Sequence, residues 1–335
     1  MVAVVIGLVT MFLLYQALIV SEKAKHHTSG IGDAQQNGLF SLFALALDIG
    51  NGGNGIALAA PELATCVDTG NIATTLRPIA VLLNDSGSND APDQIVVNYS
   101  VANILIATAE FVASAPAGSS YQVRSASGFS KGDLIVAISM AGACASSTVT
   151  AVSAPDPAGV VAIAHSGVSV DFPSSSRLLN LGAANRTQRT RYDVASSVLR
   201  SLDLLTAGAQ PNPLSSNVVR LKLQYGVDTD GDGVLDSWVS ATGAWSATQL
   251  MSAPIATISQ IKAVRVGLIM RSEQFDRELG HYHWVLFDCD KADKTQCPGR
   301  LTGTIAASTA PAGNWRYRVY ETIVPLRNAL WNRAT

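Results

Sequence analysis

The first twenty residues are the feature that most restricts the fold of this chain. Residues 1–20, MVAVVIGLVTMFLLYQALIV, contain no charged side chain, and only Thr10, Tyr15 and Gln16 interrupt the apolar run. A run of this length predicts a transmembrane helix. A cleaved signal peptide is the alternative, but the run lacks a preceding basic segment and a small-residue cleavage site at its end. We therefore expect residues 1–20 to be retained as a membrane anchor.

The helix is expected to continue past the apolar run. Residues 21–50 place a broad apolar face at helical spacing, which predicts an amphipathic continuation. The sequence GNGGNG at residues 50–55 ends it, because glycine and asparagine readily adopt positive φ.

The nearest basic residues conflict with an exported chain. Lys23 and Lys25 follow the apolar run, and the positive-inside rule would place them in the cytoplasm, where disulfides are rare. The conflict disappears if the natural chain extends further at its N-terminus and carries basic residues there. We therefore expect Met1 to be an internal methionine.

After residue 50 the pattern changes to short β-rich runs separated by Gly, Ser, Asp and Pro. We predict an α+β fold in which the long N-terminal helix packs on an antiparallel β-rich region over residues 51–335, either as one unit or as two subdomains divided near residues 175–195. The strands are expected at residues 94–99, 133–138, 160–164, 218–225, 261–270, 282–287 and 315–321.

Charge and motifs argue against two functional classes. The chain has 23 basic and 25 acidic residues and no basic block, so we expect no nucleic-acid partner. Neither a G-x-S-x-G nor an S-x-x-K motif lies in a strand-turn-helix context, so we expect no catalytic residues and no enzymatic activity.

The acidic segment at residues 228–236, DTDGDGVLD, carries the strongest local chemistry. Carboxylates at relative positions 1, 3, 5 and 9 with glycine at position 6 predict a loop that wraps one hard cation, and calcium is the natural occupant. Val239 stands at the twelfth position, where a full calcium loop has glutamate. A metal-free Asp-Gly turn is the alternative. The expected ligands are the side chains of Asp228, Asp230, Asp232 and Asp236 and the carbonyl of Val234.

The four cysteines, Cys66, Cys144, Cys289 and Cys297, contain no C-x-x-C pair, which argues against a zinc ribbon or a thioredoxin-like site. An even number in an exported chain predicts two disulfides. Cys289 and Cys297 are expected to close a short polar loop, which leaves Cys66 to pair with Cys144. Four free buried thiols are the alternative.

Several segments along the chain carry a family resemblance. They are residues 35–38, 47–49, 128–133, 225–228 with Trp238, 264–268, 271–272, 317–322 and 324–328. In this order they resemble the PilW-like minor pilins of type IV pili. Residues 1–9 look like the hydrophobic half of a prepilin helix whose upstream half, with the processing site and a near-terminal glutamate, is absent.

The resemblance implies a minor pilin that is held in the inner membrane by a single helix, with a periplasmic C-terminal region, and that then enters the pilus. It would help to assemble or prime the pilus at the inner membrane and at the pilus tip. The implied partners are other minor pilins, the major pilin, a tip adhesin, the inner-membrane assembly platform and the membrane itself. A membrane-tethered, calcium-dependent adhesive module that never enters a fibre is the alternative.

Overall fold

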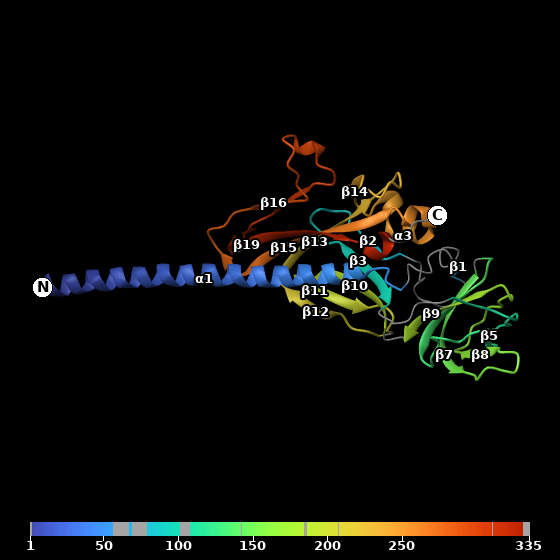
Figure 1. Ribbon diagram of the computed structural model, residues 1–335. Helices are drawn as coiled ribbons and strands as arrows, with labels where there is room; N and C mark the ends of the chain where they lie inside the picture. Colours follow the sequence, from blue (N-terminus) through green and yellow to red (C-terminus); the bar gives the residue numbers. More distant parts are fainter. Residues whose placement is uncertain are drawn as a thin grey trace.

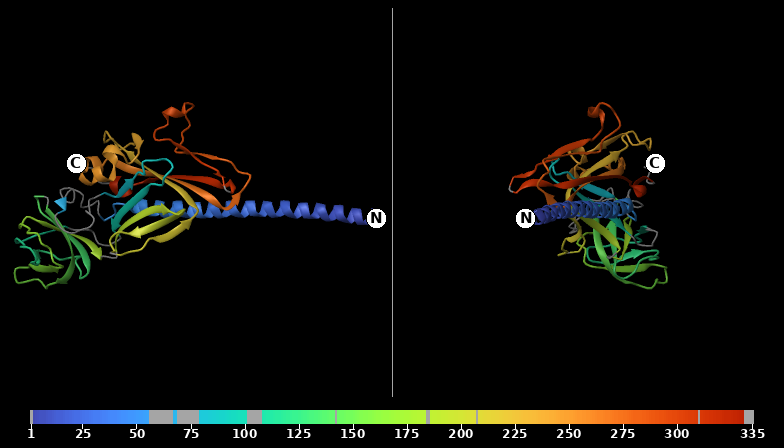
Figure 2. Two further views of the ribbon diagram at one scale, coloured as in Figure 1. Left: turned by 180° about the vertical axis from the view of Figure 1, so that it is seen from behind. Right: turned by 90° about the vertical axis from the view of Figure 1, so that its left-hand side faces the viewer.

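The computed structural model describes residues 2–55, 67–68, 79–100, 108–141, 143–183, 186–206, 208–309 and 311–330. Helix α1 (Val2–Asn51) projects from one end of the molecule, and its N-terminal part stands clear of the strands (Figure 1; Figure 2). The strands form two bodies. The first lies along the C-terminal half of the helix and leaves one face of it exposed, and the second lies at the end opposite the N-terminus (Figure 1).

Two five-stranded sheets form the first body. One has the order β12-β11-β10-β3-β2, and the other has the order β14-β13-β15-β19-β18. The strands of the first sheet are β2 (Val81–Asn84), β3 (Gln94–Ser100), β10 (Thr187–Ala195), β11 (Val198–Asp203) and β12 (Asn212–Ser216). Those of the second are β13 (Val218–Val227), β14 (Ser237–Val239), β15 (Ile261–Asp276), β18 (Ser308–Thr309) and β19 (Ala312–Pro325).

Short elements complete the first body. A two-stranded hairpin of β16 (Tyr282–Leu286) and β17 (Leu301–Ile305) packs Trp284 and Leu286 against Ile269 and Tyr317 of the second sheet. Its connecting loop projects away from the body (Figure 1). The short helices are η2 (Gly243–Trp245), α3 (Ala247–Ser252), α4 (Ile255–Ile258), η3 (Lys294–Gln296) and α5 (Arg327–Leu330).

The second body is a seven-stranded sheet. Six of its strands lie between β3 and β10 in the chain, and the seventh, β1, precedes β2. Its strands follow the order β4-β9-β6-β7-β8-β5, and β1 pairs with β7 in parallel. A bridge between Phe111 and Val123 brings the two ends of this order together, so the sheet curls around its own apolar core. The strands are β1 (Val67–Asp68), β4 (Thr108–Glu110), β5 (Tyr121–Val123), β6 (Asp133–Ile138), β7 (Ala143–Val152), β8 (Val161–His165) and β9 (Arg177–Ala183).

Helix α1 is fastened to the first body by apolar and polar contacts. Leu45 and Ile49 are fully buried in the core that both five-stranded sheets share. Between them, the Asp48 carboxylate accepts hydrogen bonds from the hydroxyls of Tyr99, at 3.0 Å, and Tyr192. Burial and this carboxylate raise the pKa of both tyrosines, because a phenolate beside a carboxylate in a buried site is unfavourable. Both tyrosines therefore remain hydrogen-bond donors to the helix at ordinary pH.

A glycine sets how closely α1 approaches β19. A Cβ atom on Gly38 would lie 2.4 Å from Cε2 of Tyr320, well inside van der Waals contact. The Tyr320 hydroxyl donates to the carbonyl of Ala34, one turn earlier, at 3.4 Å. Gly38 thus provides the space into which the Tyr320 ring packs flat against the helix.

The two sheets of the first body are also joined by a buried ion pair. Lys222 of β13 and Asp93, which precedes β3, each expose 2% of their side chains, and Nζ lies 2.7 Å from Oδ1. The Lys222 ammonium also donates to the carbonyls of Ser88 and Ala91 at 2.8 and 3.0 Å. Asp93 Oδ2 accepts the amide of Leu223 at 3.0 Å. Every charged group here has partners, which is the condition under which a buried ion pair is tolerated.

The sequence located many strands but not their arrangement. The runs predicted as strands fall on β3, β6, β8, β13, β15, β16 and β19. The predicted fold class, one helix packed on one antiparallel β-rich region, is wrong. Apart from α1 the described helices are short, and the strands divide among several sheets, one of which curls around a core of its own. The chain passes from the seven-stranded sheet to a five-stranded sheet between Ala183, where β9 ends, and Thr187, where β10 begins.

The expectation of a membrane anchor at residues 1–20, and with it a single-pass inner-membrane location, is wrong. Among the residues that the structure describes, no helix combines the length and the apolar character needed to cross a membrane.

Candidate functional site

The acidic loop is the turn between β13 and β14. The two strands pair antiparallel, with Val227 opposite Ser237, so residues 228–236 project from the end of the ladder. Gly231 and Gly233 have φ of 80° and 90°, a conformation that favours glycine. They turn the backbone back toward Asp228, and this brings carboxylates that are spaced along the sequence close together in space.

The carboxylates of the loop hold its backbone. Asp228 is 1% exposed, and its two oxygens accept the amides of Gly231 at 2.7 Å and Gly233 at 3.0 Å. Lys262 Nζ lies 3.9 Å from Asp228 Oδ2. Asp236 accepts both the hydroxyl and the amide of Thr229 at 2.6 Å, and these two bonds lower the pKa of that carboxyl. The two bonds therefore favour the ionised form of Asp236, the form in which a carboxylate binds a cation.

Three of the predicted ligands come together. Oxygen atoms of Asp228, Asp230 and Asp236 all lie within 4.8 Å of one another, which suits a hard cation bound between them. Asp232 is not part of this group, and its Oδ1 accepts the amide of Val234 at 2.7 Å. The residues of the loop fit a calcium ion in part, and calcium binding here stays a prediction.

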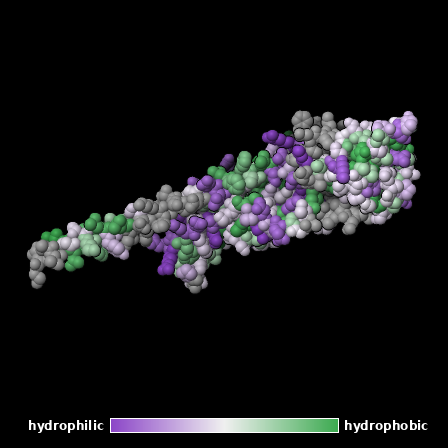
Figure 3. Space-filling model, turned by 90° about the horizontal axis from the view of Figure 1, so that it is seen from below, coloured by the Kyte–Doolittle hydropathy of each residue, from purple (hydrophilic) through white to green (hydrophobic). Residues whose placement is uncertain are grey.

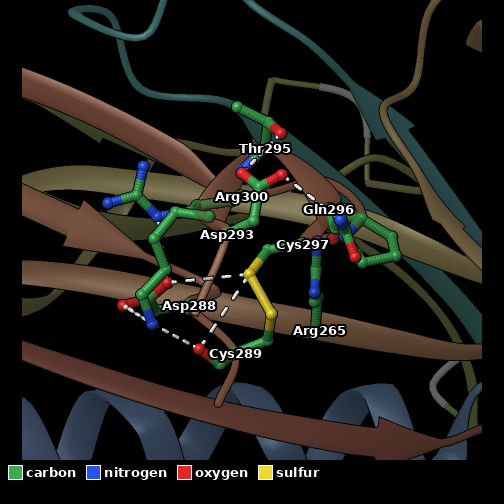
Figure 4. The surroundings of a disulfide bond; sticks show 10 residues. Arg265, Asp288, Cys289, Asp293, Thr295, Gln296, Cys297 and Arg300 are labelled. Atoms are coloured by element: carbon green, nitrogen blue, oxygen red, sulfur yellow. Dashed lines mark hydrogen bonds and ion pairs between the residues drawn. A yellow bond between two sulfur atoms is a disulfide. The ribbon is translucent and has the colours of Figure 1, made fainter. Parts of the chain in front are cut away.

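The second loop, between β16 and β17, contains the local disulfide. Cys289 and Cys297 are joined, with their Cα atoms 5.6 Å apart, as their spacing led us to expect (Figure 4). Asp288 Oδ1 accepts Arg300 Nε at 2.9 Å, and Asp288 Oδ2 lies 3.3 Å from Lys294 Nζ. Cys144 on β7 is also disulfide-bonded. Cys66, its predicted partner, lies outside the described residues.

Arg265 of β15 connects the acidic loop with the disulfide loop. Its guanidinium carbon lies 4.9 Å from the ring centroid of Trp238, which follows the acidic loop, and 4.3 Å from that of Phe287, which precedes the disulfide loop. It donates to Gln224 Oε1 at 2.8 Å and to the carbonyl of Pro298 at 2.7 Å. Burial lowers the pKa of Arg265 to about 10, against the opposing charge of Glu321, so the side chain stays cationic at neutral pH.

This arrangement of Arg265 was not predicted from the sequence. Arginine at an inward position of a strand interrupts the apolar pattern, and the two aromatic rings that receive it, one on β14 and one directly after β16, are distant in the sequence. Arg265 thus links the strand that follows the acidic loop with both ends of the disulfide loop.

A third feature is the outer face of α1. Leu39, Phe40, Phe43 and Leu47 expose 60%, 53%, 67% and 55% of their surface, whereas Leu45 and Ile49 on the inner face are fully buried. Figure 3 shows apolar residues at the slender N-terminal end and again along the middle of the molecule. Scattered exposed apolar residues are normal, but four on one face within nine residues form a patch that calls for a partner.

Residues 185–328 match the family model of the type IV pilus-assembly protein W. This match supports a protein related to type IV pilus assembly. The matched range runs from the start of β10 into α5 and includes both loops and Arg265. It covers less than half of the 335-residue chain and leaves out α1 and the second body. Neither the curated proteins nor the solved structures contain a match to the chain.

The segments that carried the resemblance divide at the same boundary. Those from Tyr225 to Asn328 lie inside the matched range, and those at residues 35–38, 47–49 and 128–133 lie outside it. The matched range therefore contains β10, β11 and β12 of one five-stranded sheet and the whole of the sheet β14-β13-β15-β19-β18, and the strands of the second body lie outside it.

Proposed function

We propose that this protein is a minor pilin that takes part in assembling or priming the type IV pilus and is incorporated at the pilus tip. The relation to pilus assembly comes from the match over residues 185–328. The observation that carries the finer proposal is the uncovered apolar face of α1, Leu39, Phe40, Phe43 and Leu47.

The apolar face indicates how the protein would join a fibre. Each large apolar side chain removed from water contributes roughly 1.5 to 3 kcal/mol, so neighbouring helices that cover this face would gain several such contributions. The side chains of Ile6, Phe12 and Leu18 are likewise exposed, which extends the available contact toward the N-terminus. The expected partners are the helices of other minor pilins and of the major pilin.

The second body supports a position at the end of the fibre. It lies beyond the C-terminal end of α1, on the opposite side of the molecule from the helix N-terminus (Figure 1). A subunit that carries such a body in line with its helix leaves little room for another subunit stacked directly upon it. It would present the second body outward, where a tip adhesin or a surface could contact it.

Recovery in sheared pili tests the proposal. Phe43→Asp places a charge in the middle of the apolar face and should reduce recovery of the protein with sheared pili by about tenfold or more. Thr302→Asp adds the same charge at an exposed position of β17 and should leave recovery unchanged. If the two variants co-purify equally well, or if the wild-type protein is absent from sheared pili, the proposal is wrong.

A calcium-dependent binding module is the second candidate, favoured by the grouping of Asp228, Asp230 and Asp236. Binding to the folded state alone would add about 2.7 kcal/mol of stability when free calcium is a hundredfold above its dissociation constant. Thermal melts with calcium and with chelator measure this gain, which Asp230→Ala should remove and Glu273→Ala, at an exposed acid on β15, should retain. Identical melting midpoints at millimolar calcium would exclude the module.

A further inference from the structure

A cavity of about 240 Å³ lies beside α1, away from both loops of the candidate site. Ala34 of α1 forms one wall, and Leu279, Tyr282 and Tyr317 form the apolar part of the others. Ser272 of β15 and Arg316 and Arg318 of β19 complete the lining. The cavity is smaller than the usual site for a cofactor or a drug-sized ligand, and its size suits one or two amino-acid side chains.

The aromatic wall of this cavity is fixed in place. The rings of Tyr282 and Tyr317 stack with their centroids 4.8 Å apart. The Tyr317 hydroxyl donates to Asn314 Oδ1 at 2.7 Å, so it is already used. The Tyr282 hydroxyl has no hydrogen-bond partner among the residues that the structure describes, and it is free to donate to a ligand.

The two arginines of the lining differ in their electrostatic state. Arg316 Nη2 lies 2.8 Å from Asp276 Oδ2, and this ion pair neutralises its charge. Arg318 is exposed and makes no ion pair or hydrogen bond through its side chain with any described residue. It stands near both Tyr282 and Tyr320, where its charge partly offsets the rise in their pKa that burial causes. The lining therefore carries one uncompensated positive charge.

We propose that this cavity binds the carboxylate of an Asp or Glu side chain that another protein chain presents alongside α1. A guanidinium is planar and presents paired N–H donors that match the two oxygens of a carboxylate. The tyrosine hydroxyl supplies a further donor, and the stacked rings accommodate the methylene groups of the acidic side chain. One uncompensated charge matches a carboxylate monoanion better than a phosphate, which carries close to two charges at neutral pH. The inference does not depend on the proposed pilus function.

Peptide titration of the full-length protein tests this site. The probe is the blocked peptide Ac-Ala-Leu-Glu-Leu-Ala-NH₂, and the readout is the Arg318 Nε–Hε resonance in protein labelled with ¹⁵N-arginine, assigned from its loss in Arg318→Gln. The glutamate peptide should shift this resonance saturably, whereas the peptide with Gln in place of Glu should not. Peptide binding to the Arg318→Gln variant is measured by the fluorescence of the neighbouring tyrosines. The variant should bind the glutamate peptide about tenfold more weakly than the wild type, or weaker still.

Arg277→Gln is the matched control, since Arg277 is exposed in the loop just before Leu279 but does not line the cavity. It removes the same charge and should keep the wild-type affinity. The proposal is overturned if the Glu and Gln peptides bind equally, if Arg277→Gln weakens binding as much as Arg318→Gln, or if the Glu peptide does not bind. The proposal is also overturned if inorganic phosphate displaces the peptide at a concentration below that of the peptide, because the cavity would then be a site for small anions.

Discussion

Replacing Lys222 by methionine should strongly destabilise the first body. Methionine keeps most of the volume of the side chain but removes the ammonium, which leaves the Asp93 carboxylate, 2% exposed, without its only cationic partner among the described residues. The carbonyls of Ser88 and Ala91 each lose one donor at the same time. The two sheets are therefore left with an uncompensated charge between them.

The size of the effect follows from the burial of both partners. Breaking a buried ion pair by removing one partner typically costs about 3 to 5 kcal/mol. The pair of Lys294 with Asp288 provides the contrast, since those side chains are 44% and 45% exposed, and an exposed pair contributes only about 0 to 1 kcal/mol. Lys222→Met and Lys294→Met should thus differ by several kcal/mol although each removes one lysine charge.

Urea denaturation followed by tryptophan fluorescence measures this difference. All five tryptophans lie at residue 238 or beyond, outside the inserted second body, so the signal reports on the part of the chain that contains Lys222. A lowered transition midpoint at an unchanged slope indicates lost stability rather than a changed unfolded state. If Lys222→Met is no less stable than Lys294→Met, the buried pair does not hold the sheets together and the reasoning fails.

The pH dependence gives an independent check. Burial raises the pKa of the Asp93 carboxyl above its ordinary value of 3.8, and Lys222 opposes this rise. Without the ammonium the folded-state pKa rises further. As the pH falls from 7, the folded variant then takes up a proton that the unfolded chain does not, so its stability relative to the wild type recovers. If the stability that Lys222→Met loses relative to the wild type grows as the pH falls, this account is wrong.

Two further predictions concern the helix and the disulfide loop. Gly38→Ala should separate α1 from β19 and lower the melting temperature, because the new Cβ would clash with the Tyr320 ring. Gly50→Ala is the control: the atom nearest to its new Cβ is 3.8 Å away, so this variant should be stabilised by up to about 1 kcal/mol through helix propensity. Replacing Cys289 and Cys297 by serine should cost the hairpin about 2 to 3 kcal/mol of loop closure, seen as faster amide exchange of β16 and β17. Unchanged exchange would show that the Arg265 contacts alone hold the loop.

The sequence predicted local structure better than the relation between distant segments. Runs of β-branched residues such as residues 94–99 and 133–138 became strands because their alternating or continuous apolar character requires burial. The closing of the second sheet through Phe111 and Val123 depends on a bridge between short segments with no periodic signal. The sequence therefore left open whether the β-rich region forms one unit or two subdomains.

In the candidate site, too, part of the arrangement was predictable from local spacing and part was not. The spacing of Asp228, Asp230 and Asp236 was enough to predict that their carboxylates come together, because the glycines between them fix the turn. Asp232 was assigned to the same group, but it binds its own backbone instead. The role of Thr229, whose hydroxyl donates to Asp236, was missed because a threonine at a non-ligand position carries no distinguishing pattern.

The segment between Ser100 and Thr187 leaves the first body and returns to it at neighbouring positions, so it can be replaced as a unit. The chain leaves the first body after Ser100 and returns at Thr187, and these two residues are opposite each other in the β3–β10 ladder. Register partners in antiparallel strands have Cα atoms only about 5 Å apart, a distance that a hairpin turn spans. β1, which precedes β2 in the chain, also pairs with β7, so a second segment of the chain contributes to this body. Genes encoding such a chain could therefore gain, lose or replace the segment between Ser100 and Thr187 while the hydrogen-bond register of the sheet on either side stays the same.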